Sequence, residues 1–245
     1  MEFVTPEGLR RDGRRPKELR QLKCEVGVFP HADGSATFNI GNTQVIATVF
    51  GPRVADSRGE SSTDRAIVKC AYSESHFAAG SRRQRKGRGD RRTAELASTV
   101  RKALEETILV ELFPKAQIDL GIQVLQADGS VLAACINAAM LAVADAGIPM
   151  RDMIAATTVG YLESTPLLDI NHTERTGNGP ELLLALHVNQ DKAIIITEEG
   201  AVNPETLEGM AELAEQGCKA VGKFLRQSLL EHIQRHATVR GLTVK

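Results

Sequence analysis

The chain has 245 residues, a formal net charge of −1 and four cysteines. This length is sufficient for one large domain or two fused small ones with a real hydrophobic core. The charge excludes a globally basic nucleic-acid binder but leaves room for a local basic patch. The cysteines are scattered without CxxC spacing, as in reduced thiols of an intracellular protein. The N-terminal residues match neither a signal nor a transit peptide, and no apolar run suits a bilayer, so we expect no membrane partner.

The first part of the chain predicts a small antiparallel sheet. Residues 8–20 are a charged lead-in, which we interpret as a solvated arm. Tight turns and alternating apolar residues then predict an antiparallel meander over residues 24–29, 35–40 and 43–51. Residues 53–64 are almost free of apolar side chains and predict a long exposed loop, which is usually functional or disordered. A fourth strand is expected over residues 66–73.

The most polar stretch is residues 80–92, where seven of thirteen residues are Lys or Arg. A charge run of this kind is often only a solvated loop. The density of arginine favours contact with a polyanion instead, because guanidinium groups bind phosphodiesters in a bidentate way. The candidate RNA-binding residues are Arg65, Arg82, Arg83, Arg85, Lys86, Arg88, Arg91 and Arg92.

An amphipathic helix is predicted over residues 91–113, with Asp90 as its cap and Pro114 as its stop. Its apolar residues recur at every fourth position: Leu96, Val100, Leu104, Ile108 and Leu112. Arg91 and Arg92 would lie in the first turn, where the helix dipole disfavours cations. This conflict indicates that they face a negative ligand. A mostly apolar strand is expected next, over residues 118–125.

Residues 131–146 predict a helix that is buried on all sides, because Cys135 and Asn137 are its only polar residues before Asp145. Asp128 to Ser130 supply turn and N-cap chemistry, and Gly147 supplies the C-terminal cap. The N-terminus of such a helix is a potential anion site.

The remaining chain predicts a second cluster of strands, over residues 153–162, 167–170, 182–188 and 192–197, with a polar loop at 171–180. Asn203 and Pro204 begin a last helix. Its expected core face comprises Leu207, Met210, Ala214, Val221, Leu225 and Ile233. We therefore predict an α+β fold in which mixed sheets pack on a buried central helix and flanking helices. The domains would comprise residues 1–149 and 150–245.

Several segments, taken in order, resemble one known family. They are Arg11-Asp12-Gly13-Arg14, Glu18-Leu19-Arg20, Gly41-Asn42-Thr43, Asp90-Arg91-Arg92, residues 123–129, Asn137-Ala138-Ala139 and residues 145–152. The set is similar to the RNase PH family over nearly the whole chain. It is most similar to the exosome ring subunit that carries phosphorolytic catalysis in archaeal exosomes.

The resemblance implies the RNase PH fold and a six-membered ring of such subunits, through which RNA threads, with RNA-binding cap proteins. In active members, inorganic phosphate attacks the last phosphodiester of RNA and releases a nucleoside diphosphate. The chemistry needs RNA-binding arginines, a Gly-Ser-Arg phosphate cradle at a helix N-terminus, and two carboxylates six residues apart for acid and metal function.

Carried over residue by residue, the resemblance leaves one of these three elements intact. Arg91 and Arg92 match the arginine pair. The cradle falls on Ser130, Val131 and Leu132, so its hydroxyl and its cation are replaced by apolar side chains. The carboxylate pair falls on Arg175 and Glu181, which reverses one charge. The neighbouring Glu174 is discounted as a substitute, because a shift of one residue changes the direction of a side chain on a strand-like backbone.

The expected function is therefore that of a non-catalytic RNA-binding exosome subunit with no catalytic residues, metal or cofactor. A separate hydrolytic nuclease would degrade the RNA, in the nucleus, nucleolus and cytoplasm. One alternative is an active phosphate-dependent 3′–5′ exoribonuclease, which would use Mg²⁺ and inorganic phosphate. Another is a soluble α+β protein that binds no RNA.

Overall fold

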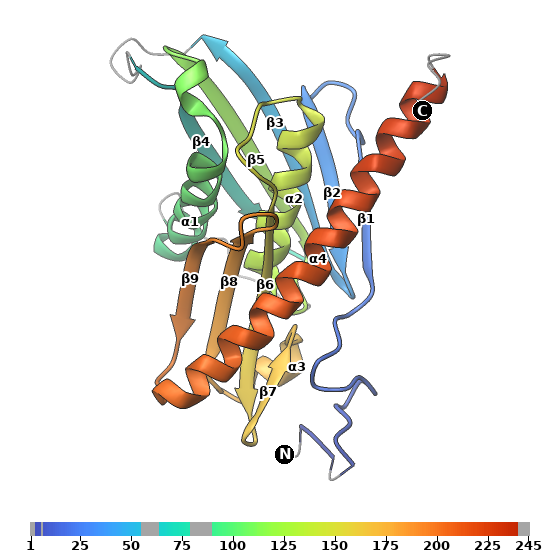
Figure 1. The fold of residues 1–245 in the computed structure, drawn as a ribbon, viewed down its shortest axis with the longest axis vertical. Coiled ribbons are helices and arrows are strands. Elements are labelled where there is room, and N and C mark those ends of the chain that lie inside the picture. The colour runs from blue at the N-terminus through green and yellow to red at the C-terminus, as the bar shows by residue number, and fades with distance from the viewer. Residues whose placement is uncertain (1–2, 6, 55–63, 79–89, 240–245) are drawn as a thin grey trace.

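The computed structural model describes residues 3–5, 7–54, 64–78 and 90–239 (Figure 1). These residues form two β-sheets, one from each half of the chain, with helices packed between and around them. The predicted α+β architecture is confirmed. Among the described residues, no helix combines the length and apolar character that crossing a membrane requires.

The first sheet has five strands, and its first three form the predicted antiparallel meander. The fourth strand of the chain lies at the far edge, parallel to the fifth, because a helix connects these two strands as a crossover. In spatial order the strands are β1 (Leu22–Val26), β2 (Gly34–Ile40), β3 (Thr43–Val54), β5 (Ala116–Gln126) and β4 (Ile67–Glu74).

The crossover helix α1 (Arg91–Thr107) is shorter than predicted. The chain becomes extended at Ile108, which forms an isolated bridge with Met150, and only a short 3-10 turn, η1 (Val110–Leu112), follows. Leu112 is therefore 59% exposed, although its spacing fits the helical period. Pairing with the segment before the second sheet ends the helix six residues early, since 113 was the expected end.

Helix α2 (Val131–Asp145) has no solvated face and is the core of the molecule. It contacts β2 and β3 of the first sheet and β6 of the second. Its buried Asn137 is satisfied by the backbone of Ala156, donating at 3.0 Å and accepting at 2.9 Å. Gly147 has φ +69°, as its predicted role at the C-terminus requires. The prediction of a central buried helix is confirmed.

The second sheet is antiparallel, and the long helix α4 (Pro204–Val239) crosses it diagonally to reach β1 (Figure 1). Most of the predicted core face of α4 is buried, but Ile233 is 55% exposed because the last turns extend past the sheet. The strands lie in the order β7 (Thr165–Leu168), β6 (Ile154–Leu162), β8 (Glu181–His187) and β9 (Ala193–Glu199).

The predicted polar loop at 171–180 contains a helical turn, α3 (His172–Arg175). It is closed by a reciprocal capping box. The Asn171 side chain accepts from the Glu174 N–H at 2.9 Å, and the Glu174 carboxylate accepts from the Asn171 N–H at 2.9 Å. Asn171 and Glu174 have the spacing of a capping box, which signals a helix start that the polar composition of the loop did not reveal.

The charged N-terminal arm is exposed over most of its residues, as composition predicted, but two of its arginines are buried. Arg10 is buried and donates from Nε to Glu174 Oε1 at 2.7 Å and from Nη1 to the Leu168 carbonyl at 2.6 Å. Arg20, also buried, pairs with Asp169. The arm is therefore held against the second sheet by arginines whose partners lie in the other half of the chain.

Candidate functional site

Two helix N-termini lie at the same end of the first sheet. Strands β4 and β5 run parallel, and β5 leads directly into α2. Helix α1 returns along β4, since the Ala66 N–H at the start of β4 donates to the carbonyl of Val110 after α1 at 2.9 Å. The first turns of α1 and α2 therefore both lie near the carboxyl ends of these strands.

The first turn of α1 presents Arg91 and Arg92, and both are exposed. Asp90 occupies the N-cap position, but its side chain accepts a hydrogen bond from the Thr93 hydroxyl at 3.0 Å and caps no backbone N–H. The turn thus combines N–H groups that the Asp90 side chain does not cap with two exposed cations. This arrangement favours an external anion.

The other basic candidates are placed differently. Arg82, Arg83, Arg85, Lys86 and Arg88 lie outside the described residues. Arg65 is exposed just before β4, at the opposite end of the strand from Arg91. An eight-residue strand spans about 25 Å. The structure therefore brings Arg91 and Arg92 together but separates Arg65 from them.

The turn before α2 is tightly fixed. Gly129 has φ +80°, and a Cβ atom there would lie 2.2 Å from the carbonyl oxygen of Ile170, so only glycine fits. Ser130 is left-handed, with φ +51°, and its hydroxyl donates to the same carbonyl at 3.2 Å instead of capping α2. The family pattern places a glycine at this left-handed position. Val131 and Leu132 follow, half-buried, at the start of the helix.

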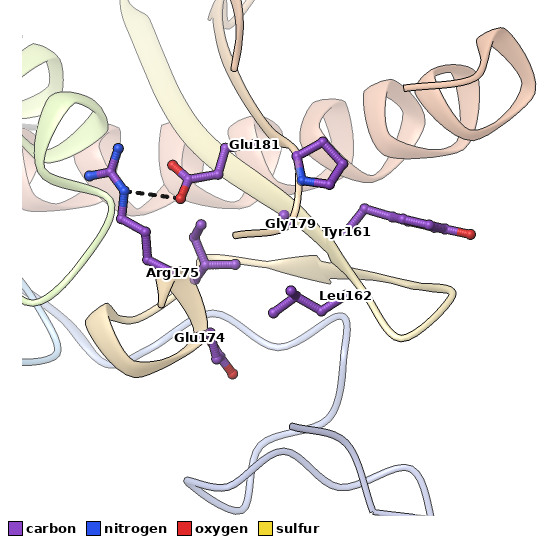
Figure 2. Close-up of a pocket in the computed structure, with 9 residues that line it drawn as sticks. Tyr161, Leu162, Glu174, Arg175, Gly179 and Glu181 are labelled. Atoms are coloured by element: carbon purple, nitrogen blue, oxygen red, sulfur yellow. Dashed lines mark ion pairs between the residues drawn. The ribbon is translucent and has the colours of Figure 1, made fainter. Parts of the chain in front are cut away.

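The two residues that match the catalytic carboxylates form an ion pair. Figure 2 shows Arg175 reaching toward Glu181, with 3.0 Å between Nε and Oε1. Arg175 Nη2 also lies 3.2 Å from Oε2 of Glu199. Glu181 and Glu199 are direct cross-strand partners in β8 and β9. Like charges in such positions repel, and Arg175 reduces this repulsion by pairing with both.

Burial raises the pKa of Glu181, and the positive charges of Arg175 and Arg92 oppose that shift. Helix α1 also contacts β9, which lies beside β8 in the second sheet. Arg175 and Glu181 thus form one contact at the start of β8, and Arg91 and Arg92 lie together in the first turn of α1. The turn at Asp128 lies beside α3, because its carboxylate accepts the His172 N–H at 3.2 Å.

Glu174 does not substitute for a catalytic acid. Its side chain has no exposed surface, and its carboxylate is shared between Arg10 and the Asn171 N–H. In Figure 2 it points away from the pair of Arg175 and Glu181. The expectation from sequence that Glu174 does not replace the missing acid is consistent with this geometry.

The site does not fit the divalent metal that active family members use. A guanidinium stands between Glu181 and Glu199, and a cation there repels Mg²⁺ and occupies the carboxylate oxygens that would bind it. Over residues 3–5, 7–54, 64–78 and 90–239, no three His, Cys, Asp or Glu side chains cluster as metal ligands do.

Sequence reasoning missed Glu199 and Asp169. Glu199 joins the ion pair only through the register of β8 and β9. Asp169 binds Arg20 across 149 residues of chain. No local pattern signals either contact.

Comparison with known sequences gives the family. The sequence model of the 3′ exoribonuclease family, domain 1, matches residues 18–149, and that of domain 2 matches residues 152–217. The chain belongs to the RNase PH family. The expectation from the ordered motifs is confirmed.

Similar members of the RNase PH family carry exosome names. The chain is 47% identical to the exosome complex component RRP41 homolog of Arabidopsis thaliana over 236 residues, with 96% of this chain and 97% of the relative covered. It is 40% identical to human exosome complex component RRP41, with 98% of each covered. It is 38% identical to exosome complex component Rrp41 of Methanopyrus kandleri, with 94% of this chain and 95% of the relative covered.

Solved structures confirm the RNase PH fold. The crystal structure of rice Rrp46 matches with a TM-score of 0.79 and 27% identity, covering 90% of this chain and all of that one. A chain of the Archaeoglobus fulgidus exosome, solved with RNA bound to the active site, matches with a TM-score of 0.76 over 91% of this chain and 93% of its own. At 21% identity, that second likeness speaks for the fold alone.

Proposed function

We propose that this chain is a non-catalytic, RNA-binding core subunit of an RNA exosome. With other RNase-PH-fold subunits it would form a six-membered ring that conducts RNA. The ring would support 3′–5′ processing and degradation by a separate hydrolytic nuclease. The exosome names of relatives that match nearly the full length of the chain support this assignment.

The ion pair between Arg175 and Glu181 is the observation that carries the proposal. Phosphorolysis brings together the charges of phosphate and the RNA backbone, and metal ions and cationic groups ordinarily stabilise them. Here the position of the metal-binding acid holds a guanidinium that is already neutralised by Glu181 and Glu199. Each lost electrostatic contribution raises the barrier by several kcal/mol.

The turn before α2 supports the same conclusion. Ser130 donates its hydroxyl to the Ile170 carbonyl, so that side chain is directed to the protein backbone. Val131 and Leu132 offer no side-chain donor to an incoming phosphate. The N–H groups of α2 remain, but the cation that would fix an attacking phosphate beside them is absent from the family's position.

The RNA-binding part of the proposal rests on Arg91 and Arg92. They are exposed on a helix turn whose dipole already carries partial positive charge, and the side chain of Asp90 at the N-cap accepts from the Thr93 hydroxyl and caps no backbone N–H. The binding of a phosphodiester at such a turn is energetically favourable. Contacts of this kind would hold an RNA strand without reading its sequence.

A phosphorolysis assay tests the absence of catalysis. The native complex, purified through a tagged copy of this chain, is incubated with RNA labelled at its internal phosphates, inorganic phosphate and Mg²⁺. We expect no nucleoside diphosphate. Phosphate-dependent release that Arg91→Glu in this chain abolishes would show an active phosphorolytic enzyme and overturn the proposal.

Subunit identification in the same complex tests the assembly. We expect other RNase-PH-fold subunits, RNA-binding cap proteins and one hydrolytic nuclease. Imaging of the tagged chain is expected to place it in the nucleus, nucleolus and cytoplasm. Recovery of the chain as a free monomer with weak, salt-independent RNA binding would favour the α+β protein that binds no RNA.

A further inference from the structure

Phe77 is an exposed aromatic residue that the site described above does not use. Its side chain is 74% exposed, and the neighbouring His76 is also exposed. Both occupy the middle of a turn that follows β4, between Ser75 and Ala78. Among the described residues, Phe77 is the most exposed phenylalanine, ahead of Phe29 at 41% and Phe50 at 39%.

The turn that carries Phe77 is held at both ends. The Ala78 N–H donates to the Ser75 carbonyl at 3.0 Å, which closes the turn, and the Ser75 N–H donates to Val124 at 2.9 Å. The Ala127 N–H donates to the Ala78 carbonyl at 2.9 Å. Hydrogen bonds to β5 and to the residue that follows it therefore fix the backbone that presents the ring.

The same hydrogen bonds place Phe77 at the RNA site. Ala127 directly precedes the Asp128 turn, so the Phe77 turn lies beside the entry to α2. The end of β4 is also the end of the sheet at which α1 begins with Arg91 and Arg92. One aromatic side chain and two arginines are thus gathered at one end of the fold.

We propose that Phe77 stacks on a base of the RNA strand whose phosphates are held by Arg91 and Arg92. This inference rests on the RNA-binding role proposed above. Sequence-independent binding of single strands combines cations that follow the backbone with aromatic rings that stack on bases. Phe77 supplies the stacking element, which the arginines cannot supply by charge alone.

An RNA base fits Phe77 better than a partner protein does. A protein-docking face is a contiguous apolar patch of several hundred Å². Phe77 is instead flanked in its turn by the polar Ser75 and His76 and by the buried Ala78. Within the described residues of this turn, Phe77 is the only exposed apolar side chain, and such a ring suits a planar ligand with polar edges, such as a nucleobase.

The test compares RNA with and without a base at the stacked position. The native complex is purified with wild-type chain or with Phe77→Ala, Phe77→Trp or Arg91→Ala in the tagged copy. Binding of a fluorescent single-stranded RNA and of the same RNA carrying abasic sites is measured by anisotropy. Phe29→Ala is the matched control, because Phe29 is an exposed phenylalanine near the opposite end of α2.

We expect Phe77→Ala to weaken binding of normal RNA by about tenfold and to leave binding of abasic RNA unchanged. Phe77→Trp should retain the affinity, Phe29→Ala should match wild type, and Arg91→Ala should weaken both RNAs. Equal affinity of Phe77→Ala and wild type for normal RNA would overturn the inference while leaving the arginine-based function intact.

Dissociation of the multisubunit complex in Phe77→Ala, seen by mass photometry, would overturn the inference in favour of a contact between subunits. Absence of RNA binding by the wild-type complex, with no effect of Arg91→Ala, would instead refute the proposed function itself. The two failures are therefore distinguished by the behaviour of the wild type and of Arg91→Ala.

Discussion

The guanidinium of Arg20 binds the carboxylate of Asp169 in a bidentate way, with Nε 2.7 Å from Oδ2 and Nη2 2.7 Å from Oδ1. The same guanidinium donates to the carbonyls of Asp128 and Gly129 in the turn before α2. One buried side chain therefore joins the N-terminal arm, the start of the central helix and the second sheet. The positions of the site residues depend on this junction.

Arg20→Met should destabilise the chain strongly, because the buried Asp169 carboxylate loses both close contacts with Arg20 and keeps only Arg14, whose Nη1 lies 3.6 Å from Oδ2. Breaking a buried pair in this way costs about 3–5 kcal/mol of unfolding free energy. Urea unfolding followed by circular dichroism measures the loss. Arg15→Met, at an exposed arginine of the same arm, should change stability by less than about 0.5 kcal/mol. Equal effects of the two variants would refute the importance of the junction.

The stability contributed by Asp169 should disappear in acid. Burial alone would raise its pKa, but hydrogen bonds and charge from Arg20 outweigh burial and hold the pKa below the ordinary value of 3.8. A carboxylate whose pKa is lower in the folded state stabilises the fold at any pH above its pKa in the unfolded state. This stabilisation is lost as the pH falls through the pKa of the folded state. The stability difference between wild type and Asp169→Asn should therefore be constant near neutrality and shrink below pH 3.8. A difference that grows in acid would contradict this assignment.

Gly129→Ala should be far more damaging than Gly147→Ala. Both glycines have positive φ, +80° and +69°, so alanine costs about 1–2 kcal/mol of backbone strain at either position. At Gly129 the new Cβ would also lie 2.2 Å from the Ile170 carbonyl, whereas nothing lies within 4 Å of it at Gly147. Thermal unfolding of the two variants measures the difference. Similar melting temperatures would show that the turn before α2 relaxes freely.

Arg91→Ala and Arg92→Ala should separate RNA binding from stability. Each should weaken RNA binding and reduce the salt slope of log K by about 0.7, the value for one phosphate contact on a single strand. The free energy of unfolding of Arg91→Ala should not fall, because a cation in the first turn opposes the helix dipole. Lys102→Ala, an exposed cation farther along α1, serves as the control and should leave the slope unchanged.

Arg175→Asp should turn the ion pair into a weak cation site. Three carboxylates would then gather where Arg175 now neutralises Glu181 and Glu199. We expect a lower melting temperature that millimolar Mg²⁺ partly restores, because bound cations stabilise the folded state. Arg175→Met should also destabilise, but with a smaller response to Mg²⁺. Identical responses of the two variants would argue against convergence of the carboxylates.

The elements that sequence predicted well are those with strong local signals. Helix α2 was recognised because a uniformly apolar run stands between a turn and a glycine, and burial on all sides follows from that pattern alone. The placement of β4 could not be predicted in the same way. Its own residues favour a strand but do not specify β5 as its parallel neighbour.

The site was predicted in part. The positions that match the family's carboxylate pair indicate Arg175 and Glu181. Their direct contact and the participation of Glu199 depend on strand register. The prediction of a solvated arm missed the buried arginines for a related reason. Composition alone indicates that an arginine is solvated, whereas Arg10 pairs with Glu174, which lies 164 residues further along the chain. Long-range ion pairs leave no periodicity that a sequence can reveal.

The anchoring of the arm also bears on the order in which the chain is made. Arg10 and Arg20 leave the ribosome long before Glu174 and Asp169 are translated, since about 150 residues separate each pair. Until then Arg10 and Arg20 lack the acids with which they pair, and the turn before α2 lacks the contact with Ile170 that closes it. The turn before α2 is therefore completed late in synthesis, after most of the first sheet has had time to form.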